Sequence, residues 1–474
     1  MNYRPMLIMR HELLLVAITV ILLLVEIFLP QDKKHKIILP AILLMALVTI
    51  AGFIPGPTGV LFGGMYGTSP LILLMKNILN IGVLIIFIQS VSWLKMEEQK
   101  EKIGEFFVIM LSTLIGMNYM ISSGDFLMFY LGLELATIPL ATLAAFERFK
   151  EKSAEAGVKL IFTSALSSGI LLYGLSMIYG TTGTVYFPEV SAAYNSTPLQ
   201  ILAFIFFFAG MAFKISLVPF HLWAADVYEG APINVTSYLS VISKGAAVFI
   251  FMIILYTVFN KIALMWRDVI YVISILTMTM GNLFAMRQRN IKRFLAFSSI
   301  AQAGFILLGI IGQSQLGMTT VVYFVLVYIF SNLGAFGVAA IISNRTGKES
   351  IDDYDGLYRT NPMLSLTMML ALFSLAGIPP VAGFFGKFFL FTAAAKQGMY
   401  ILVFIAVLNT IISLYYYLLV VKAMFLNQSD RPIAYFKSDG YTKVGLAMCI
   451  AGIIIIGFAS PVYEFILKLS YGLY

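Results

Sequence analysis

The amino-acid sequence predicts an all-α polytopic membrane protein with about 14 transmembrane helices. Of its 474 residues, 60% are hydrophobic and only 11% are charged, and the mean hydropathy is +0.93. A soluble globular protein carries about 25% charged residues, which it needs to cover its surface. Apolar runs of about 20 residues, long enough to cross a bilayer as helices, recur along the whole chain. These observations exclude a water-soluble enzyme, a disordered chain and a collagen-like or disulfide scaffold.

The apolar runs follow one another with short polar gaps. The first run comes after Arg4 and Arg10, but it is too long for a signal peptide and lacks a small-residue cleavage site, so we interpret it as a span. The predicted spans, the twelfth of them interrupted, are 12–29, 37–54, 71–92, 104–121, 125–146, 158–180, 199–219, 233–258, 268–286, 294–312, 318–343, 362–391, 400–425 and 442–468.

The basic residues in the gaps predict the orientation of the chain. If the N-terminus lies outside, the inside segments carry 19 lysines and arginines and the outside segments carry 6. Inside loops of membrane proteins are enriched in these residues, so both termini are expected outside. The net charge of +8 therefore reflects orientation in a membrane and gives no indication of nucleic-acid binding.

Six lysines fall within the predicted spans. A lysine at the bilayer centre costs about 3 kcal/mol, whereas one near a helix end can extend its ammonium group to the interface. Lys76 and Lys422 lie within one or two turns of a span end, so we expect both ammonium groups to extend to the interface. Lys159 begins its span, and its position fits either an ammonium group at the interface or a buried functional charge.

The remaining three lysines and one acid are candidates for a charge pathway through the membrane. Lys214, Lys244 and Lys387 lie deep in apolar sequence, and Glu134 is about nine residues from Asp125, near mid-bilayer. A buried carboxylate stays charged next to a lysine. Purely structural ion pairs are the alternative explanation for all four.

Two predicted spans are broken by proline and glycine, each beside one of these lysines. Lys214 is followed by Pro219, and Lys387 is preceded by the sequence Gly377-Ile378-Pro379-Pro380. Interrupted helices in corresponding halves of a chain are typical of transporters built from inverted repeats. The spacing predicts two inverted five-helix repeats. His221 follows the first break, where it could relay protons or simply form hydrogen bonds with the broken helix.

The expected domain boundaries follow from these repeats. We predict an N-terminal three-helix segment at 1–103, repeats at 104–260 and 261–425, each a proton half-channel, and a C-terminal transmembrane helix at 426–474.

Other site chemistry is sparse in the sequence. One cysteine, Cys449, cannot hold an iron–sulfur cluster, and the three histidines, His11, His35 and His221, are scattered. We find no phosphate-binding loop, dinucleotide fingerprint or metal-binding motif. We therefore expect no metal and no cofactor in this chain, and any active transport must be driven by an ion gradient or by partner subunits.

Several blocks of sequence resemble a known family. They are the run from Phe213 to Trp223, DVYEGAP at 226–232, SKGA at 243–246, GLELATIPLATLAAF at 132–146, KRFLAFSSIAQAGF at 292–305 and AGIPPVAGFFGKF at 376–388. All resemble the antiporter-like membrane subunits of proton-pumping NADH:quinone oxidoreductase, respiratory complex I. The DVYEGAP run is most similar to the branch called subunit N, or subunit 2.

The resemblance implies roles for the buried charges. Glu134 and Lys214 would form the carboxylate–lysine pair of the first half-channel, Lys244 would be the central proton carrier, and Lys387 would be the terminal lysine of the second half-channel. Lys159 and His221 match auxiliary positions along the same path.

The resemblance also implies a function and a setting. The chain would be a proton-translocating subunit in the multi-pass membrane arm, in the cell inner (cytoplasmic) membrane, coupled to electron transfer from NADH to quinone. NAD, FMN, iron–sulfur clusters and quinone would be bound by partner subunits, including other antiporter-like subunits alongside. The alternatives are a cation/proton antiporter subunit of the same fold and a purely structural subunit of the membrane arm.

Overall fold

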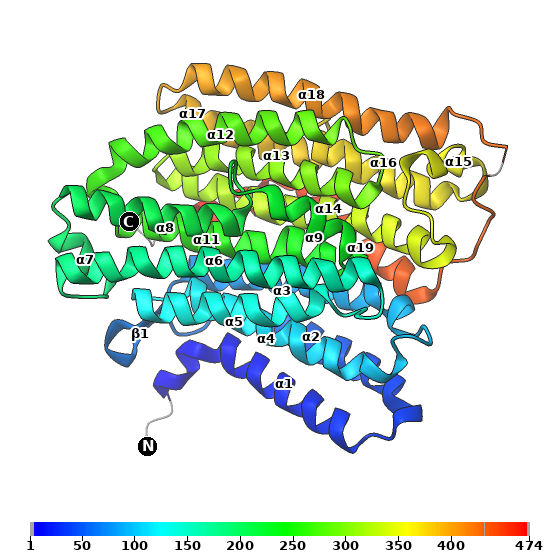
Figure 1. The fold of residues 1–474 in the computed structure, drawn as a ribbon, viewed down its shortest axis with the longest axis horizontal. Helices are drawn as coiled ribbons and strands as arrows, with labels where there is room; N and C mark the ends of the chain where they lie inside the picture. The colour runs from blue at the N-terminus through cyan, green and yellow to red at the C-terminus, as the bar shows by residue number, and fades with distance from the viewer. Residues whose placement is uncertain (1–3, 431, 472–474) are drawn as a thin grey trace.

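The computed structural model describes residues 4–430 and 432–471, and almost all of this part of the chain is helical. The helices run side by side along one common direction, which gives an elongated bundle (Figure 1). A small hairpin, β1 (Gly59–Leu61) and β2 (Tyr66–Thr68), lies at the end of the bundle near the N-terminus. The first three long helices are α1 (Arg10–Phe28), α2 (Ile38–Gly52) and α3 (Pro70–Leu94).

Two further groups of helices follow. The first group is α4 (Ile103–Ile121), α5 (Phe126–Ala144), α6 (Glu151–Thr182), α7 (Phe187–Ala193), α8 (Pro198–Ile215), α9 (Leu222–Gly230), α10 (Ile233–Tyr238), the π-helical turn η5 (Leu239–Ser243) and α11 (Lys244–Thr257). The second group is α12 (Ala263–Ala285), α13 (Ile291–Ile311), α14 (Gln315–Thr346), α15 (Leu357–Thr360), α16 (Pro362–Ala376), α17 (Ala382–Ala395) and α18 (Tyr400–Phe425). The chain then forms α19 (Gly440–Phe458) and α20 (Ser460–Ser470).

The predicted membrane spans are confirmed. In the described residues, 13 helical stretches are long and apolar enough to cross a membrane, and the shorter apolar helices α16 and α17 together occupy the interrupted twelfth span. The chain is therefore a multi-pass membrane protein. The single continuous helix predicted at 442–468 was wrong, because Ala459 leaves the helical conformation and a new helix, α20, begins at Ser460 with Pro461 in its first turn.

Both predicted helix breaks are present and resemble each other locally. The helix α8 ends at Ile215 and is capped by Ser216 with φ of 65°, and α16 ends at Ala376 and is capped by Gly377 with φ of 87°. Backbone N–H groups at each left-handed cap bond some of the last carbonyl groups of the helix. At the second break, the carbonyl groups of Leu375 and Ala376 accept hydrogen bonds from side chains instead.

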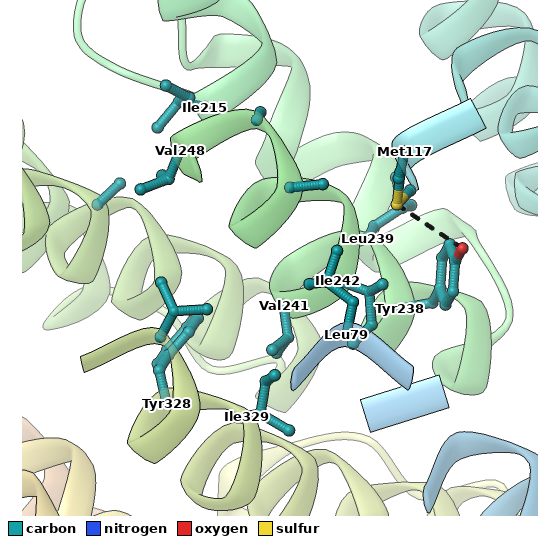
Figure 2. Packing of buried hydrophobic residues seen from close by; sticks show 14 of the residues in the cluster. Leu79, Met117, Ile215, Tyr238, Leu239, Val241, Ile242, Val248, Tyr328 and Ile329 are labelled. Carbon is teal, nitrogen blue, oxygen red and sulfur yellow. Dashed lines mark hydrogen bonds between the residues drawn. The ribbon is translucent and has the colours of Figure 1, made fainter. Parts of the chain in front are cut away.

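The core of the bundle lies around the segment from α10 to α11 and around α13, which are buried almost throughout. Figure 2 shows Leu79 of α3, Ile242 of η5 and Ile329 of α14 packed together there. By contrast, α1, α6, α12 and α18 are only about one-third buried and expose apolar side chains outward. An exposed apolar helix face suits contact with lipid. The most buried helices, in contrast, are those that carry or face Lys244.

Candidate functional site

Lys244 lies at the centre of the bundle. It is the first residue of α11, directly after the π-helical turn η5, and its side chain is 2% exposed. Its ammonium group donates hydrogen bonds to the hydroxyl oxygen of Ser299 on α13, at 2.5 Å, and to the carbonyl oxygen of the same residue, at 3.2 Å. No carboxylate of the described residues pairs with it, so neutral oxygens alone stabilise this charge.

A series of polar contacts follows α13 away from Lys244. Ser298, next to Ser299, shares a hydrogen bond with the hydroxyl of Tyr417 on α18. The same hydroxyl accepts a hydrogen bond of 3.2 Å from the amide nitrogen of Gln302, which also donates at 3.0 Å to the carbonyl of Leu375. This series of hydroxyl, amide and carbonyl groups, formed by Ser298, Tyr417, Gln302 and Leu375, reaches the last turn of α16. We call the series the α13 file.

Lys387 occupies the far end of that file. Its ammonium group donates a hydrogen bond of 3.0 Å to the carbonyl oxygen of Ala376, the residue after Leu375, and lies 4.6 Å from the centre of the Phe305 ring. Free carbonyl groups at a helix C-terminus carry partial negative charge, which favours a cation. The break between α16 and α17 therefore builds the binding place for this lysine.

A second branch of polar contacts leaves the core through α14. The amide nitrogen of Asn332 donates to the hydroxyls of Ser240 and Tyr328, both at 2.9 Å. All three residues are almost completely buried. Buried polar side chains between helices are usually hydrogen-bonded in this way, and they also line the paths of water through membrane proteins.

Glu134 interacts electrostatically with Lys214, but the two groups are not in direct contact. Lys214, in the last turn of α8, donates a hydrogen bond of 2.6 Å to Thr137, one helical turn from Glu134 on α5. No ion pair within 4.0 Å joins Lys214 to Glu134 in the described part of the chain, and one carboxylate oxygen of Glu134 is buried without a hydrogen-bond partner. The hydroxyl of Thr137 takes the place that the sequence suggested for the carboxylate.

His221 lies apart from the lysines. It precedes α9, is 4% exposed, and its ring stacks on Phe284 with 6.4 Å between the ring centres. Within the described residues, no hydrogen bond joins its ring nitrogens to Lys214 or Lys244. The structure thus gives no direct relay from His221 to either lysine.

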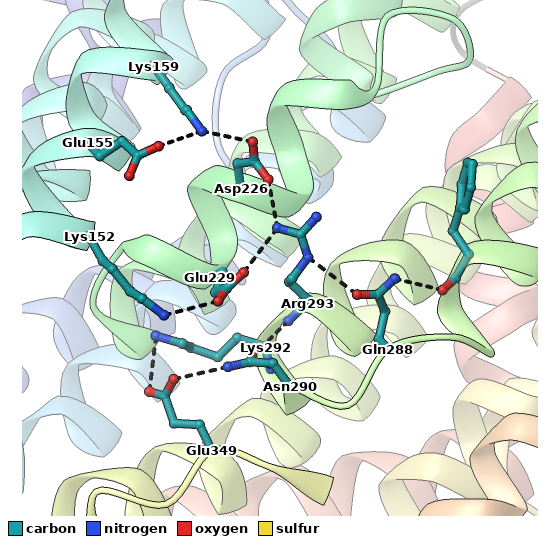
Figure 3. Close-up of polar contacts among 11 residues, drawn as sticks. Lys152, Glu155, Lys159, Asp226, Glu229, Gln288, Asn290, Lys292, Arg293 and Glu349 are labelled. Carbon is teal, nitrogen blue, oxygen red and sulfur yellow. Dashed lines mark hydrogen bonds and ion pairs between the residues drawn. The ribbon is translucent and has the colours of Figure 1, made fainter.

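Lys159 belongs to a charged network at one end of the bundle (Figure 3). Its ammonium group pairs with Glu155 at 2.7 Å and with Asp226 at 2.9 Å. Arg293 bridges Asp226, at 2.6 Å, and Glu229, at 3.0 Å. The two acids lie on one face of the short helix α9, where these cations reach both of them.

The charges of this network fix the protonation of its acids. Burial alone raises the pKa of Asp226, but hydrogen bonds from Lys159 and Arg293 outweigh it and lower that pKa. Burial likewise raises the pKa of Glu229, and Arg293 and Lys152 lower it overall. Both acids are therefore charged at neutral pH. Beside them a hollow of about 520 Å³ is lined by Glu229, Lys292 and other polar groups.

Replacing Arg293 by glutamine is expected to lower the free energy of unfolding by about 1–2 kcal/mol at pH 7, because two partly exposed ion pairs are lost. Since both acid pKa values are lowered in the folded state, the stabilisation holds above the ordinary carboxyl pKa and disappears as pH falls through the lowered values. Unfolding in detergent, followed from pH 7 to pH 3, should show this trend. Arg289→Gln, an exposed arginine without an ion pair in the described residues, should show neither effect.

One buried ion pair was missed in the sequence. Lys76, which was expected to extend to the interface, is instead 0% exposed and pairs with Glu12 of α1, while Tyr66 contacts both. The interpretation failed because it treated Lys76 by itself. Glu12 and Lys76 each lie near the N-terminal end of their helix, and the parallel helices α1 and α3 bring these ends to the same depth, a match that could have revealed the pair.

Metal-binding chemistry has few candidates. Within residues 4–430 and 432–471, no three His, Cys, Asp or Glu side chains are grouped closely enough to hold a metal ion. Cys449 is buried, and its sulfur accepts a weak hydrogen bond from Gln89. The groups that gather in this site are ammonium, hydroxyl and carbonyl groups, which can bind and pass protons.

Comparison with known proteins gives one consistent family. The family model described as "NADH:quinone oxidoreductase/Mrp antiporter, TM" matches residues 123–413, more than half of the chain. A protein of Phocaeicola vulgatus named NADH-quinone oxidoreductase subunit N is 51% identical over 465 residues, which cover 98% of each chain.

Solved structures agree with the fold. A chain of respiratory complex I from Thermus thermophilus with bound Aureothin matches with a TM-score of 0.80 and 26% identity, covering 97% of this chain and 98% of that one. A chain of the Mrp complex from Dietzia sp. DQ12-45-1b matches with a TM-score of 0.84 and 20% identity, covering 98% and 97%. At that lower identity the second likeness concerns the fold alone.

Proposed function

The chain belongs to the family of membrane subunits of NADH:quinone oxidoreductases and Mrp antiporters, and from this premise we propose that it is the proton-translocating subunit N of an NADH:quinone oxidoreductase. The observation that carries the proposal is the file of polar contacts between the buried ammonium groups of Lys244 and Lys387. A lipid-facing or purely structural lysine would not need such a file.

Proton movement in the second half follows from the partners of each lysine. The ammonium groups of Lys244 and Lys387 contact neutral oxygens, and that of Lys387 also lies over the Phe305 ring, so neither is held in a buried ion pair within the described residues. Removing one oxygen partner makes the charged form costly in an apolar interior. A small shift of α11 or of the end of α16 therefore favours transfer of the proton along α13, with water bridging gaps between the side chains.

In the first half, Glu134 and Lys214 act as a pair with two arrangements. The lysine now bonds Thr137, and the carboxylate lies one turn away on the same helix. We infer that a shift between α5 and α8 exchanges Thr137 for Glu134 as the partner of the ammonium group. Because pairing with a carboxylate stabilises a buried cation by several kcal/mol, this exchange drives proton uptake and release. Lys159 and His221 are auxiliary in this scheme.

The driving reaction takes place in partner subunits. There, electrons would pass from NADH to quinone, and NAD, FMN, iron–sulfur clusters and quinone would be bound. The single cysteine of this chain does not fit a four-thiolate cluster. The partners include other antiporter-like membrane subunits, and the translocated species is the proton.

The topology forms part of the proposal. Residues 104–260 and 261–425 are the two half-channels, between the three-helix segment 1–103 and the C-terminal segment 426–474. The charged network of Figure 3 lies at the inside end and both termini lie outside, in the cytoplasmic membrane of a bacterial cell. The excess of basic residues in the inside segments supports this orientation.

Replacing Lys214 by methionine tests the proposed function. We expect NADH-driven proton translocation by the assembled complex in proteoliposomes to fall at least about tenfold, because proton-transferring side chains contribute about 10²- to 10⁴-fold to rates. NADH oxidation by a soluble acceptor should be unchanged. The matched control is Lys422→Met, an exposed lysine on α18 without an ion pair in the described residues. Undiminished translocation by the Lys214 variant would refute the proposal.

A cation/proton antiporter subunit is the second candidate, favoured by the likeness in fold to the Mrp complex. Purification from the native membrane separates the two. Recovery together with flavin- and iron–sulfur-containing subunits supports the oxidoreductase. Sodium-dependent proton exchange by a preparation without those subunits supports the antiporter.

A further inference from the structure

A buried charged triad lies outside the lysine file, near the end of the bundle that carries the hairpin. The ammonium group of Lys76 on α3 pairs with one carboxylate oxygen of Glu12 on α1, and both side chains are 0% exposed. The hydroxyl of Tyr66 on β2 donates a hydrogen bond of 2.9 Å to the other carboxylate oxygen and accepts one of 3.0 Å from Lys76. The three groups form a closed ring of proton donors and acceptors.

The hairpin covers this ring. Its strand β2 is tied to the turn between α4 and α5, since Gly67 donates a backbone hydrogen bond of 2.8 Å to Ser122 and Gly124 donates one of 2.7 Å to Met65. The next residue after that turn, Asp125, caps the first turn of α5, the helix that carries Glu134. The triad is thus connected through the backbone to the helix of the first half-channel.

Several polar atoms around the triad are buried without a hydrogen-bond partner. Both ring nitrogens of His11, beside Glu12, have none, and the side chain is 2% exposed. A hydrogen-bond partner is also missing for the hydroxyl of Ser122 and for both amide atoms of Asn118 on α4. The same holds for one amide atom each of Asn77 and Asn80 on α3. Buried polar atoms in a membrane protein need partners, and ordered water supplies them where protein groups do not. Water bound to these atoms would link the triad to the interior of α3 and α4.

A structural role alone does not account for this arrangement. A buried ion pair holds two helices no better than apolar side chains of similar volume. Ionisable groups inside a membrane are costly and usually mark ion pathways. Here a phenol bonds both members of the pair and an imidazole, that of His11, interacts electrostatically with Lys76; both are groups that can carry protons.

We propose that Glu12, Tyr66 and Lys76 form an additional proton-transfer site, which exchanges protons with the membrane face on the hairpin side. In the transfer step, the proton on the Lys76 nitrogen moves to the Glu12 oxygen along their hydrogen bond. This leaves a neutral amine and a neutral carboxylic acid, and the total charge is unchanged. The inference rests on the proposed proton-translocating function, for which it supplies a site near the surface.

The deciding experiment compares Glu12→Gln, Lys76→Met and the double variant in the assembled complex in proteoliposomes. The double variant leaves no unpaired buried charge, so it should assemble normally. We expect it to translocate protons about tenfold more slowly than the parent, with NADH oxidation by a soluble acceptor unchanged. If the pair is only structural, the single variants lower the amount of complex and the double variant restores both the amount and full translocation. That result would overturn the proposal.

Two further variants complete the test. Tyr66→Phe keeps the ring and removes the shared hydroxyl, and we expect translocation to slow several-fold with normal assembly. If the double variant does not assemble, full translocation by Tyr66→Phe overturns the proposal and slow translocation supports it. Lys214→Met, measured in parallel, separates the two hypotheses: if it translocates normally, the proposed function fails, whereas normal rates in the triad variants alone reject only this site.

Discussion

Replacing Lys244 by methionine is expected to reduce NADH-driven proton translocation at least about tenfold, the largest loss of rate among the lysine variants. Lys244 is the buried ammonium group at the start of the α13 file, where it donates hydrogen bonds to the hydroxyl and carbonyl oxygens of Ser299. Methionine has nearly the same length and fills the same space, so packing in the core should be kept. Dye-reported acidification of proteoliposomes that contain the assembled complex measures the effect.

The control for Lys244→Met is Ser299→Ala. This change removes one of the two acceptors and keeps the Ser299 carbonyl. We expect a several-fold loss of rate, smaller than that of the lysine variant. Equal rates in the parent and in Lys244→Met would mean that protons bypass the centre of the bundle.

Replacing Gly383 by alanine is expected to disrupt the second helix break. A Cβ atom at this position would lie 1.7 Å from the carbonyl oxygen of Ser374, which belongs to the backbone of α16 and cannot rotate away. The helices α16 and α17 must then separate, at a cost of about 1–3 kcal/mol or more. Because Lys387 of α17 bonds to Ala376 of α16, separation also breaks its hydrogen bond. Both the amount of assembled complex and its proton translocation should fall strongly.

The matched control is Gly180→Ala on α6. An added Cβ there meets no atom within 4 Å, and the glycine lies in an exposed part of a regular helix. Alanine should keep or slightly raise stability, by about 0.5–1 kcal/mol. If both glycine variants behave alike, close contact of the two backbones is unimportant for the break.

The sequence allowed the spans and both helix breaks to be predicted because these features are local. A run of apolar residues must be helical in a bilayer, and proline with glycine must interrupt it. Lys244 and Lys387 stood out for the same reason, since a charge deep in such a run is visible without knowing its neighbours. Their burial in the structure agrees with that reasoning.

The partners of the lysines could not be predicted, because they come from distant segments. Tyr417 lies more than a hundred residues from Ser298 and Gln302 and reaches them only through the packing of α18. The contact of Lys214 with Thr137 rather than with Glu134 depends on the relative position of α5 and α8 to within about one helical turn. Hydropathy and spacing do not fix the packing of two helices to that precision. The roles of these residues in proton transfer remain predictions for the variants above to decide.

The two helix breaks hold their lysines in different ways. Lys214 belongs to the final turn of the helix before its break, whereas Lys387 follows its break and reaches back to the terminus of the preceding helix. The Lys387 ammonium group therefore rests against the negative pole of α16, whereas the Lys214 ammonium group bonds Thr137 on the neighbouring helix α5. Sliding the end of α16 by about one ångström would change the energy of the Lys387 cation with no new charge arriving. Under the proposed function, mechanical displacement would in this way be converted into electrostatic work.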